Sequence, residues 1–252
     1  MGDWSEVMIR KLYIGVLLII LLGCDNENAF DCVKTVGEIQ SYELDLPAFD
    51  KVEVFGDIEV IISNSFEQSV VLETGENLFP KISFDVTDGL FTISDDNGCN
   101  WARKYKNTTL YINSNKLTEI RNSGARDIKS NGTYELDHKL NLVSKGTSGD
   151  YYIDIQGPAL NISNNQASNY YITGEVNQLF VGFYSGVGRF EGADLIANNV
   201  DFFQRGENDI IVNPQSRLSG SIEAFADVVM VNVPSEIDIT YNGTGKLVYP
   251  EN

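Results

Sequence analysis

A phrase of seven residues returns six times in the second half of the chain, and no other feature restricts the fold as strongly. Each copy begins with polar or small residues, ends on an apolar one and follows a short apolar strand such as Leu140–Leu142. The six copies are Thr147–Ile153, Gln166–Ile172, Tyr184–Phe190, Gln204–Ile210, Glu223–Val229 and Tyr241–Leu247, with a weaker earlier copy at Arg121–Ile128. Their starting positions advance by 19, 18, 20, 19 and 18 residues. A period near 19 with two or three strands describes one turn of a parallel β-solenoid, in which each turn buries its apolar face only against its neighbours.

The first half of the chain is typical of less regular β structure. Val52 and Val54 alternate with polar residues, the run Ile58–Ile62 does the same, and Asp88-Gly89 is a strong hairpin signal. A β-sandwich, the alternative, also has short strands, but it does not repeat one phrase six times. The period differs from that of left-handed hexapeptide helices. We therefore predict an all-β fold, a right-handed parallel β-helix of about 18–20 residues per rung with a less regular N-terminal part.

The charge and composition restrict the partners. The chain has 36 acidic and 18 basic residues, a formal net charge of −18. Binding to nucleic acid needs clustered Lys and Arg, so we exclude a nucleic-acid partner. The chain also has 24 Asn and 22 Gly, the residues that most readily adopt positive φ, which suits a fold with many turns.

The N-terminus is typical of an exported protein. Arg10 and Lys11 precede the apolar run Leu12–Leu22, which is too short to cross a bilayer and fits the core of a signal peptide. The sequence Leu21-Leu22-Gly23-Cys24 resembles the lipobox of bacterial lipoproteins, in which the cysteine is acylated and becomes the mature N-terminus. We therefore expect a signal peptide over residues 1–23, an acylated N-terminus and tether over 24–45 and a β-helix domain over 46–252.

Two details of this N-terminal assignment stay open. The acids Asp3 and Glu6 are unusual ahead of a signal core, so Met8 is an alternative start. The acidic segment Asp25–Asn28 resembles a surface-export signal, and a plain solvated linker is the other interpretation. For Cys24 itself the alternative is an ordinary buried cysteine. With acylation, the acyl chains on Cys24 attach the protein to a membrane, and we place it at the outer membrane of the cell envelope.

The two remaining cysteines, Cys32 and Cys99, are an even number in an oxidising compartment. We predict that they form a disulfide, and two free buried thiols are the alternative. In the chain-entropy model such a bridge stabilises the fold by about 4 kcal/mol.

The residues that usually carry catalysis are sparse. His138 is the only histidine, so the chain has no histidine cluster for zinc and no spare base for a Ser-His pair. Acid pairs such as Asp95-Asp96 are typical of solvated turns. The segment Asp95-Asp96-Asn97 offers oxygen ligands for calcium but lacks the full ligand spacing of a calcium-binding loop. We predict no catalytic residues, no metal and no cofactor, and a protein that is not an enzyme. The alternative is a polysaccharide lyase or hydrolase whose acids, with an Arg, converge on an outward face.

The repeat alignment also predicts a surface feature. If Ile153, Ile172, Phe190 and Ile210 point inward, then the residues before them point outward at one place on consecutive rungs, about 4.8 Å apart. This candidate binding ladder consists of Tyr152, Tyr171 and Arg189, with Asp209 next in line. Aromatic and Arg side chains contribute much contact energy, so the ladder could face a glycan or a partner protein. The alternative is that the tyrosines only stabilise neighbouring rungs.

Several segments in order resemble one family. They are Leu46–Val54, Gly56–Val60, Asn77–Ile82, Asp88–Ile93, Cys99–Arg103 and Gly243–Tyr249. Together they are similar to the auto-transporter adhesin head GIN domain family over roughly residues 46–250. The resemblance implies a Bacteroidetes envelope lipoprotein with a β-helical body, on the cell surface or in the periplasm. We expect a binding or adhesin-like module whose partner is a glycan or an envelope or host protein.

Overall fold

The computed structural model describes residues 35–98, 108–146 and 149–250. The chain divides into two compact units, and the description below concerns the larger one, Val36–Asp96 with Tyr105–Asn252. It is a β-solenoid of about six turns in which strands account for 63% of the described residues, which confirms the predicted fold class. The strands are β1 (Ile39–Glu43), β2 (Lys51–Gly56), β3 (Ile58–Ser63), β4 (Ser69–Gly75), β5 (Ile82–Thr87), β6 (Leu90–Asp95), β7 (Thr108–Asn113), β8 (Glu119–Gly124), β9 (Ile128–Glu135), β10 (Lys139–Ser144), β11 (Tyr151–Asn164), β12 (Tyr170–Phe183), β13 (Phe190–Gln204), β14 (Ile210–Ile222), β15 (Val228–Met230), β16 (Glu236–Tyr241) and β17 (Leu247–Val248), with a short 3₁₀ turn at Phe79–Lys81.

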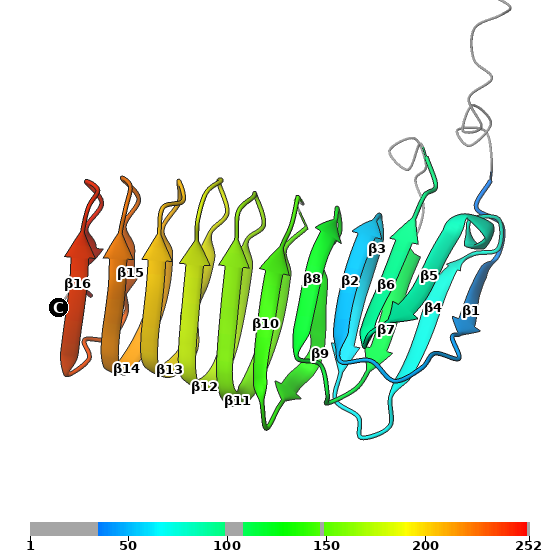
Figure 1. Ribbon diagram of the computed structural model, residues 1–252, viewed down its shortest axis with the longest axis horizontal. Helices are drawn as coiled ribbons and strands as arrows, with labels where there is room; N and C mark the ends of the chain where they lie inside the picture. The colour runs from blue at the N-terminus through cyan, green and yellow to red at the C-terminus, as the bar shows by residue number, and fades with distance from the viewer. Residues whose placement is uncertain (1–34, 99–107, 147–148, 251–252) are drawn as a thin grey trace, which may run out of the picture. The chain divides into compact units, whose positions relative to one another are not determined.

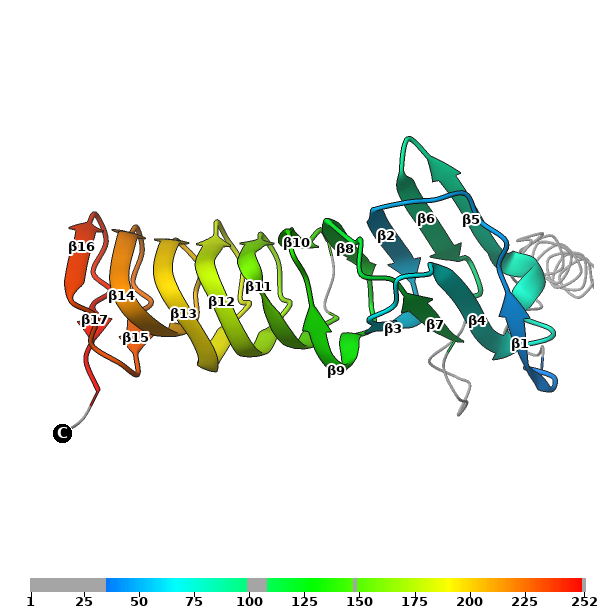
Figure 2. The same cartoon turned by 90° about the horizontal axis from the view of Figure 1, so that it is seen from below.

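Two parallel ladders of strands form the walls of the solenoid (Figures 1 and 2). The first contains β6, β2, β8, β10, the C-terminal halves of β11 to β14, and β16. The second contains β7, β3, β9, the N-terminal halves of β11 to β14, β15 and β17. From β10 on, register partners in consecutive turns lie 17 to 21 residues apart, as in Ile196 with Asn213 and Gln178 with Asn199. The predicted period is therefore the period of strand stacking.

The N-terminal part does not follow chain order. Strand β2 lies between β6 and β8, and β3 lies between β7 and β9, with all four pairings parallel (Figure 1). Beside this inserted turn, β4 pairs with β7, β1 with β4 and β5 with β6, all antiparallel. An early segment of the chain thus becomes an internal turn of the solenoid.

The core lies between the two ladders and consists of the alternate residues that point inward. Tyr151, Tyr170, Phe190 and Ile210 are register partners on the second ladder, and each is fully buried. The rings of Tyr151 and Tyr170 stack with centroids 4.6 Å apart. The Tyr151 hydroxyl donates to the Val143 carbonyl (2.7 Å), which satisfies a polar group that would be costly to bury alone.

Aspartate side chains connect the corners of successive turns. Each carboxylate accepts a hydrogen bond from a backbone N–H of the next turn. The Asp150 carboxylate accepts the Asn169 N–H (2.8 Å), and the Asp227 carboxylate accepts the Lys246 N–H (2.7 Å). Asp127 and Asp209 accept the N–H of Asp150 and Asp227 in the same way. The residues in each pair occupy the same place, directly before a strand of the second ladder. Part of the acidic excess is therefore structural.

In the described ranges, no helix has the length and hydrophobicity that crossing a membrane requires.

Candidate functional site

Several predicted site residues lie outside the described residues. Cys24, the proposed lipidation site, and both Cys32 and Cys99, the proposed disulfide partners, fall in the ranges 1–34 and 99–107. These assignments stay predictions.

The structure pairs two members of the predicted ladder. Tyr152 and Tyr171 are register partners on the outer face of the second ladder, and their rings stack with centroids 4.8 Å apart. On the next turn, Tyr171 pairs with Glu191 and Tyr170 pairs with Phe190. The repeat alignment had instead placed Phe190 after Ile172. Arg189 lies before that strand, and its Nε donates to the Glu191 carboxylate. Arg189 is thus linked to the two tyrosines only through Glu191. The Asp209 carboxylate accepts the Asp227 N–H at its corner.

The ring faces of Tyr152 are already occupied. Tyr171 stacks on it, and the Lys129 ammonium lies 5.8 Å from its ring centroid. A sugar ring binds an aromatic side chain best on the ring face, and both faces of the Tyr152 ring already have a neighbour. The contacts therefore favour the structural interpretation, in which the tyrosines stabilise neighbouring rungs.

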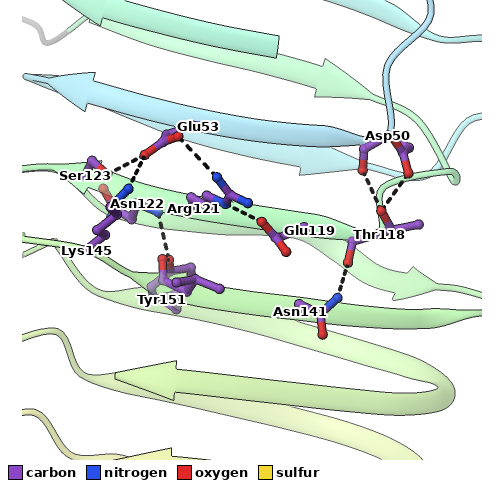
Figure 3. Close-up of polar contacts among 11 residues, drawn as sticks. Asp50, Glu53, Thr118, Glu119, Arg121, Asn122, Ser123, Asn141, Lys145 and Tyr151 are labelled. Carbon is purple, nitrogen blue, oxygen red and sulfur yellow. Dashed lines mark hydrogen bonds and ion pairs between the residues drawn. The ribbon is translucent and has the colours of Figure 1, made fainter. Parts of the chain in front are cut away.

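A second cluster brings acids and an arginine together on the outer face of β2 and β8, next to Lys145, which directly follows β10 (Figure 3). The Glu53 carboxylate is nearly buried, accepts a hydrogen bond from the Ser123 hydroxyl (3.1 Å) and lies 3.5 Å from an Arg121 Nη1. Arg121 also pairs with Glu119, and the Lys145 ammonium lies 3.9 Å from Glu53. Such convergence is what the enzyme alternative requires, but here the opposite charges neutralise one another.

This cluster belongs to a longer seam, which we define as the polar contacts between the inserted turn β2–β3 and the turn β8–β9. The Asp57 carboxylate pairs with Arg126, Glu59 pairs with Lys129, and Asp50 accepts the Thr118 hydroxyl (2.8 Å). With Glu53 and Ser123, these partners lie 68 to 70 residues apart in the sequence. In the ion pairs that cross the seam, the acids lie on the inserted turn and the bases on its neighbour, which also carries Glu119 and Asp127. Arg126 donates a hydrogen bond to Asp57, and Lys129 donates one to Glu59. Each bond raises the pKa of its donor side chain, because it stabilises the charged form.

A polar groove of about 580 Å³ lies at the other corner of the turns, between the end of each second-ladder strand and the start of the next first-ladder strand. Its lining crosses five consecutive turns, from β9 to β14. At about 4.8 Å per strand, the groove extends roughly 19 Å along the stacking direction. It is lined by Glu135, Leu136, Gln156, Gly157, Pro158, Glu175, Val176, Asn177, Ile196, Asn198 and Gln215.

One wall is a column of exposed polar side chains. Glu135, Gln156 and Glu175 are register partners on β9, β11 and β12, and Ile196 follows Glu175 on β13. Among the described residues, neither the carboxylates of Glu135 and Glu175 nor the amide of Gln156 has a side-chain partner. These groups are available to a ligand.

Other side chains of the lining are held in place by hydrogen bonds. The Asn198 amide donates to the Asn177 side-chain oxygen (3.1 Å), and the Ser216 hydroxyl donates to the Asn198 oxygen (2.5 Å). The Gln215 amide donates to the Asn213 side chain (2.8 Å). The buried Val176 lies among the lining residues, and Pro158 and the exposed Ile196 add apolar surface. A groove with ordered amides, two carboxylates and small apolar patches suits an elongated ligand rich in hydroxyl groups.

The histidine takes part in local contacts. His138 Nε2 lies 3.0 Å from the Leu117 carbonyl, and its Nδ1 lies 2.9 Å from Asp137. That hydrogen bond lowers the pKa of the Asp137 carboxyl. Within the part of the chain that the structure describes, no three His, Cys, Asp or Glu residues are grouped so as to hold a metal ion.

Sequence reasoning missed the groove. Gln156 and Glu175 lie four positions after Tyr152 and Tyr171, so extending the repeat alignment by four residues would have placed them in one column. Glu135 gives no such signal, because β9 and β11 change register between Tyr152 and Asp154.

These features define the class of the protein: a parallel β-solenoid with a polar groove along one corner. Residues 48–234 match the family described as "Putative auto-transporter adhesin, head GIN domain", and the chain belongs to this family. The family is adhesin-like, which indicates a protein of the cell surface or envelope.

Solved structures with the same fold come from Bacteroides and Parabacteroides species. A putative adhesin from Bacteroides fragilis has 18% sequence identity and a TM-score of 0.76. A putative lipid binding protein from Parabacteroides distasonis has 17% identity and a TM-score of 0.63, and a putative adhesin from Parabacteroides merdae has 16% identity and a TM-score of 0.58. Each match covers 84% of this chain and 97% of the other. At these identities the likeness shows a shared fold. None of the curated proteins matches the chain.

Proposed function

We propose that the protein is a lipid-anchored, non-enzymatic binding module of the cell envelope whose groove holds a glycan chain. The groove is the observation that carries this proposal. Its length across five turns suits a linear polymer, and its amides and carboxylates can bind vicinal hydroxyl groups. Membership of an adhesin-like family supports a binding role at the cell surface.

The exposure of the two groove acids supports a non-enzymatic role. Glycoside hydrolysis by two carboxyl groups needs one that keeps its proton near neutral pH, usually through burial. Glu135 and Glu175 are both exposed. They are better suited to hold a ligand by hydrogen bonds than to donate a proton to a leaving group.

A glycan array tests the groove. Full-length protein in detergent should bind a subset of glycans, and Gln156→Trp, which places a bulky ring in the groove, should abolish that binding. The matched control is Gln40→Trp, because Gln40 is equally exposed but lies on β1, away from the groove lining. Equal binding by both variants would remove the groove from the proposal.

The lipid anchor has its own test. Cys24→Ser should prevent incorporation of labelled palmitate and move the protein from the membrane fraction to the soluble fraction. Protease treatment of intact cells then distinguishes exposure on the cell surface from a periplasmic location. Palmitate incorporation that survives Cys24→Ser would contradict acylation at this residue.

The proposed bridge between Cys32 and Cys99 is tested by thiol titration of the denatured Cys24→Ser protein. Without reductant no thiol should react, and after reduction two should. Two reactive thiols before reduction would show that the cysteines are free.

The seam supports a second candidate, a polysaccharide lyase or hydrolase, because Glu53, Glu119 and Arg121 converge there on one outer face. Incubation with a panel of polysaccharides and detection of new reducing ends tests it. Cleavage that Arg121→Ala abolishes in a protein that remains folded would establish this activity. No cleavage of any polysaccharide would count against it.

A further inference from the structure

We infer that the groove prefers glycans that carry free amino groups over neutral or acidic ones. This inference rests on the proposed function and specifies its ligand. Two of the groove's lining residues are acids and none is Lys, Arg or His. A uronic, sulfated or phosphorylated chain would therefore meet negative charge without a compensating cation.

The acids of the groove differ from those of the seam in being unpaired. Glu53, Asp57 and Glu59 each contact a cation on the neighbouring turn. Among the described residues, the carboxylates of Glu135 and Glu175 contact no cation. The net charge of −18 adds a negative potential that attracts a cationic ligand from solution.

The spacing of the column fits a linear chain of sugars. Glu135 and Glu175 are separated by two strand spacings, about 9.6 Å, with Gln156 between them. A pyranose unit in a linear polysaccharide has a length similar to one strand spacing. A chain along the groove would bring an amino group to Glu135, a hydroxyl group to Gln156 and a second amino group to Glu175.

The inserted turn holds the first of these acids in position. With the Asn64 amide oriented to satisfy both of its groups, its oxygen accepts the Glu135 N–H (2.7 Å) and its nitrogen donates to the Glu135 carbonyl (3.1 Å). Asn64 directly follows β3, so the N-terminal segment fixes the backbone at one end of the groove. Glu135 is also in register with Gln156 on the following turn.

Binding measurements on two oligosaccharides test the inference. The probes are glucosamine hexamers of equal length, one fully deacetylated and one fully N-acetylated, titrated into full-length protein in detergent. We expect the deacetylated hexamer to bind about tenfold more tightly at low salt, because two ion pairs form, and this advantage should shrink as salt is added.

Charge-neutral variants show whether the two acids cause the preference. Glu135→Gln with Glu175→Gln should lose most of the preference for the deacetylated hexamer, with little change for the N-acetylated one. The matched control is Glu67→Gln with Glu207→Gln, two exposed acids outside the groove lining, which should keep the preference. Circular dichroism confirms that each variant is folded.

Each outcome decides between the proposals. If wild-type protein binds both hexamers alike and Gln156→Trp abolishes both, the inference is overturned and the glycan groove stands. A preference that survives loss of both acids also overturns it. If neither hexamer binds, the inference fails, and a blank glycan array would show that the proposed function fails with it. Oligolysine of equal charge that binds as tightly as the amino glycan would identify a cationic peptide as the ligand and overturn the inference.

Discussion

Asp57 and Arg126 lie 69 residues apart in the chain and form an ion pair through both carboxylate oxygens, with Arg126 donating from Nε to Oδ1 and from Nη2 to Oδ2 (3.3 Å). Asp57 lies between β2 and β3, and Arg126 lies between β8 and β9. The other contacts of the seam have nearly the same sequence separation. Opposite charges on the two turns thus favour the one arrangement in which the early segment is inserted beside β8–β9.

We predict that the Asp57–Arg126 pair couples these turns. Asp57→Ala and Arg126→Ala should each destabilise the fold, and a double-mutant cycle should give a coupling of about 0.5–1 kcal/mol, because the pair is partly exposed. Urea unfolding at low salt measures it, and the coupling should fall in high salt.

The control for this cycle is Asp194→Ala, an exposed acid on β13 with no side-chain partner in the described part of the chain. It should change stability little. A coupling free energy of zero between the two substitutions would show that the pair does not help to hold the inserted turn beside β8 and β9.

The corner aspartates give a larger expected effect. Asp150→Ala leaves the Asn169 N–H without its acceptor and removes a contact to the Asn169 side-chain amide (3.1 Å). The free energy of unfolding should fall by about 1–3 kcal/mol. Asp150→Asn keeps an acceptor oxygen and should recover part of the loss. If the two variants were equally unstable, the carboxylate charge and not the hydrogen bond would be the important property.

The stacked tyrosines should affect stability more than binding. Tyr171→Ala removes the ring that stacks on Tyr152 and should lower the free energy of unfolding by about 0.5–1.5 kcal/mol. Glycan binding should stay unchanged, because the ring faces of Tyr152 are already used and the groove lies at the other end of the strand. Loss of binding in a folded Tyr171→Ala protein would restore the ladder of Tyr152, Tyr171 and Arg189 as the binding site.

Stability should decline at alkaline pH because three tyrosines are buried. Burial raises the pKa of Tyr134, Tyr151 and Tyr170 above the ordinary value of 10.0. A group whose pKa is raised in the folded state contributes its full stabilisation at a pH below its pKa in the unfolded chain. This contribution is lost as the pH rises through its pKa in the folded protein.

The free energy of unfolding should therefore decrease as the pH rises above about 10. Ultraviolet titration checks this, since these tyrosines should ionise only as circular dichroism reports unfolding. Ionisation of all 12 tyrosines in a folded chain would contradict the prediction.

The repeat period alone determined that the chain is a solenoid, because strands that stack in register impose the same spacing on every turn. Ile153, Ile172, Phe190 and Ile210 were all correctly placed inward. The alignment failed at Phe190, which stacks on Tyr170, because it counted corner residues as if every corner had one length. Register is decided by packing in the strands, while corners vary in length.

Only the tertiary structure decided the order of turns and the location of the groove. A parallel strand can pair with many neighbours, so nothing local in β2 indicates that it lies between β6 and β8. The choice depends on contacts such as Asp57 with Arg126, which join segments far apart in the chain. The groove arises in the same way, since Glu135 and Glu175 become neighbours of Gln156 only when successive turns stack.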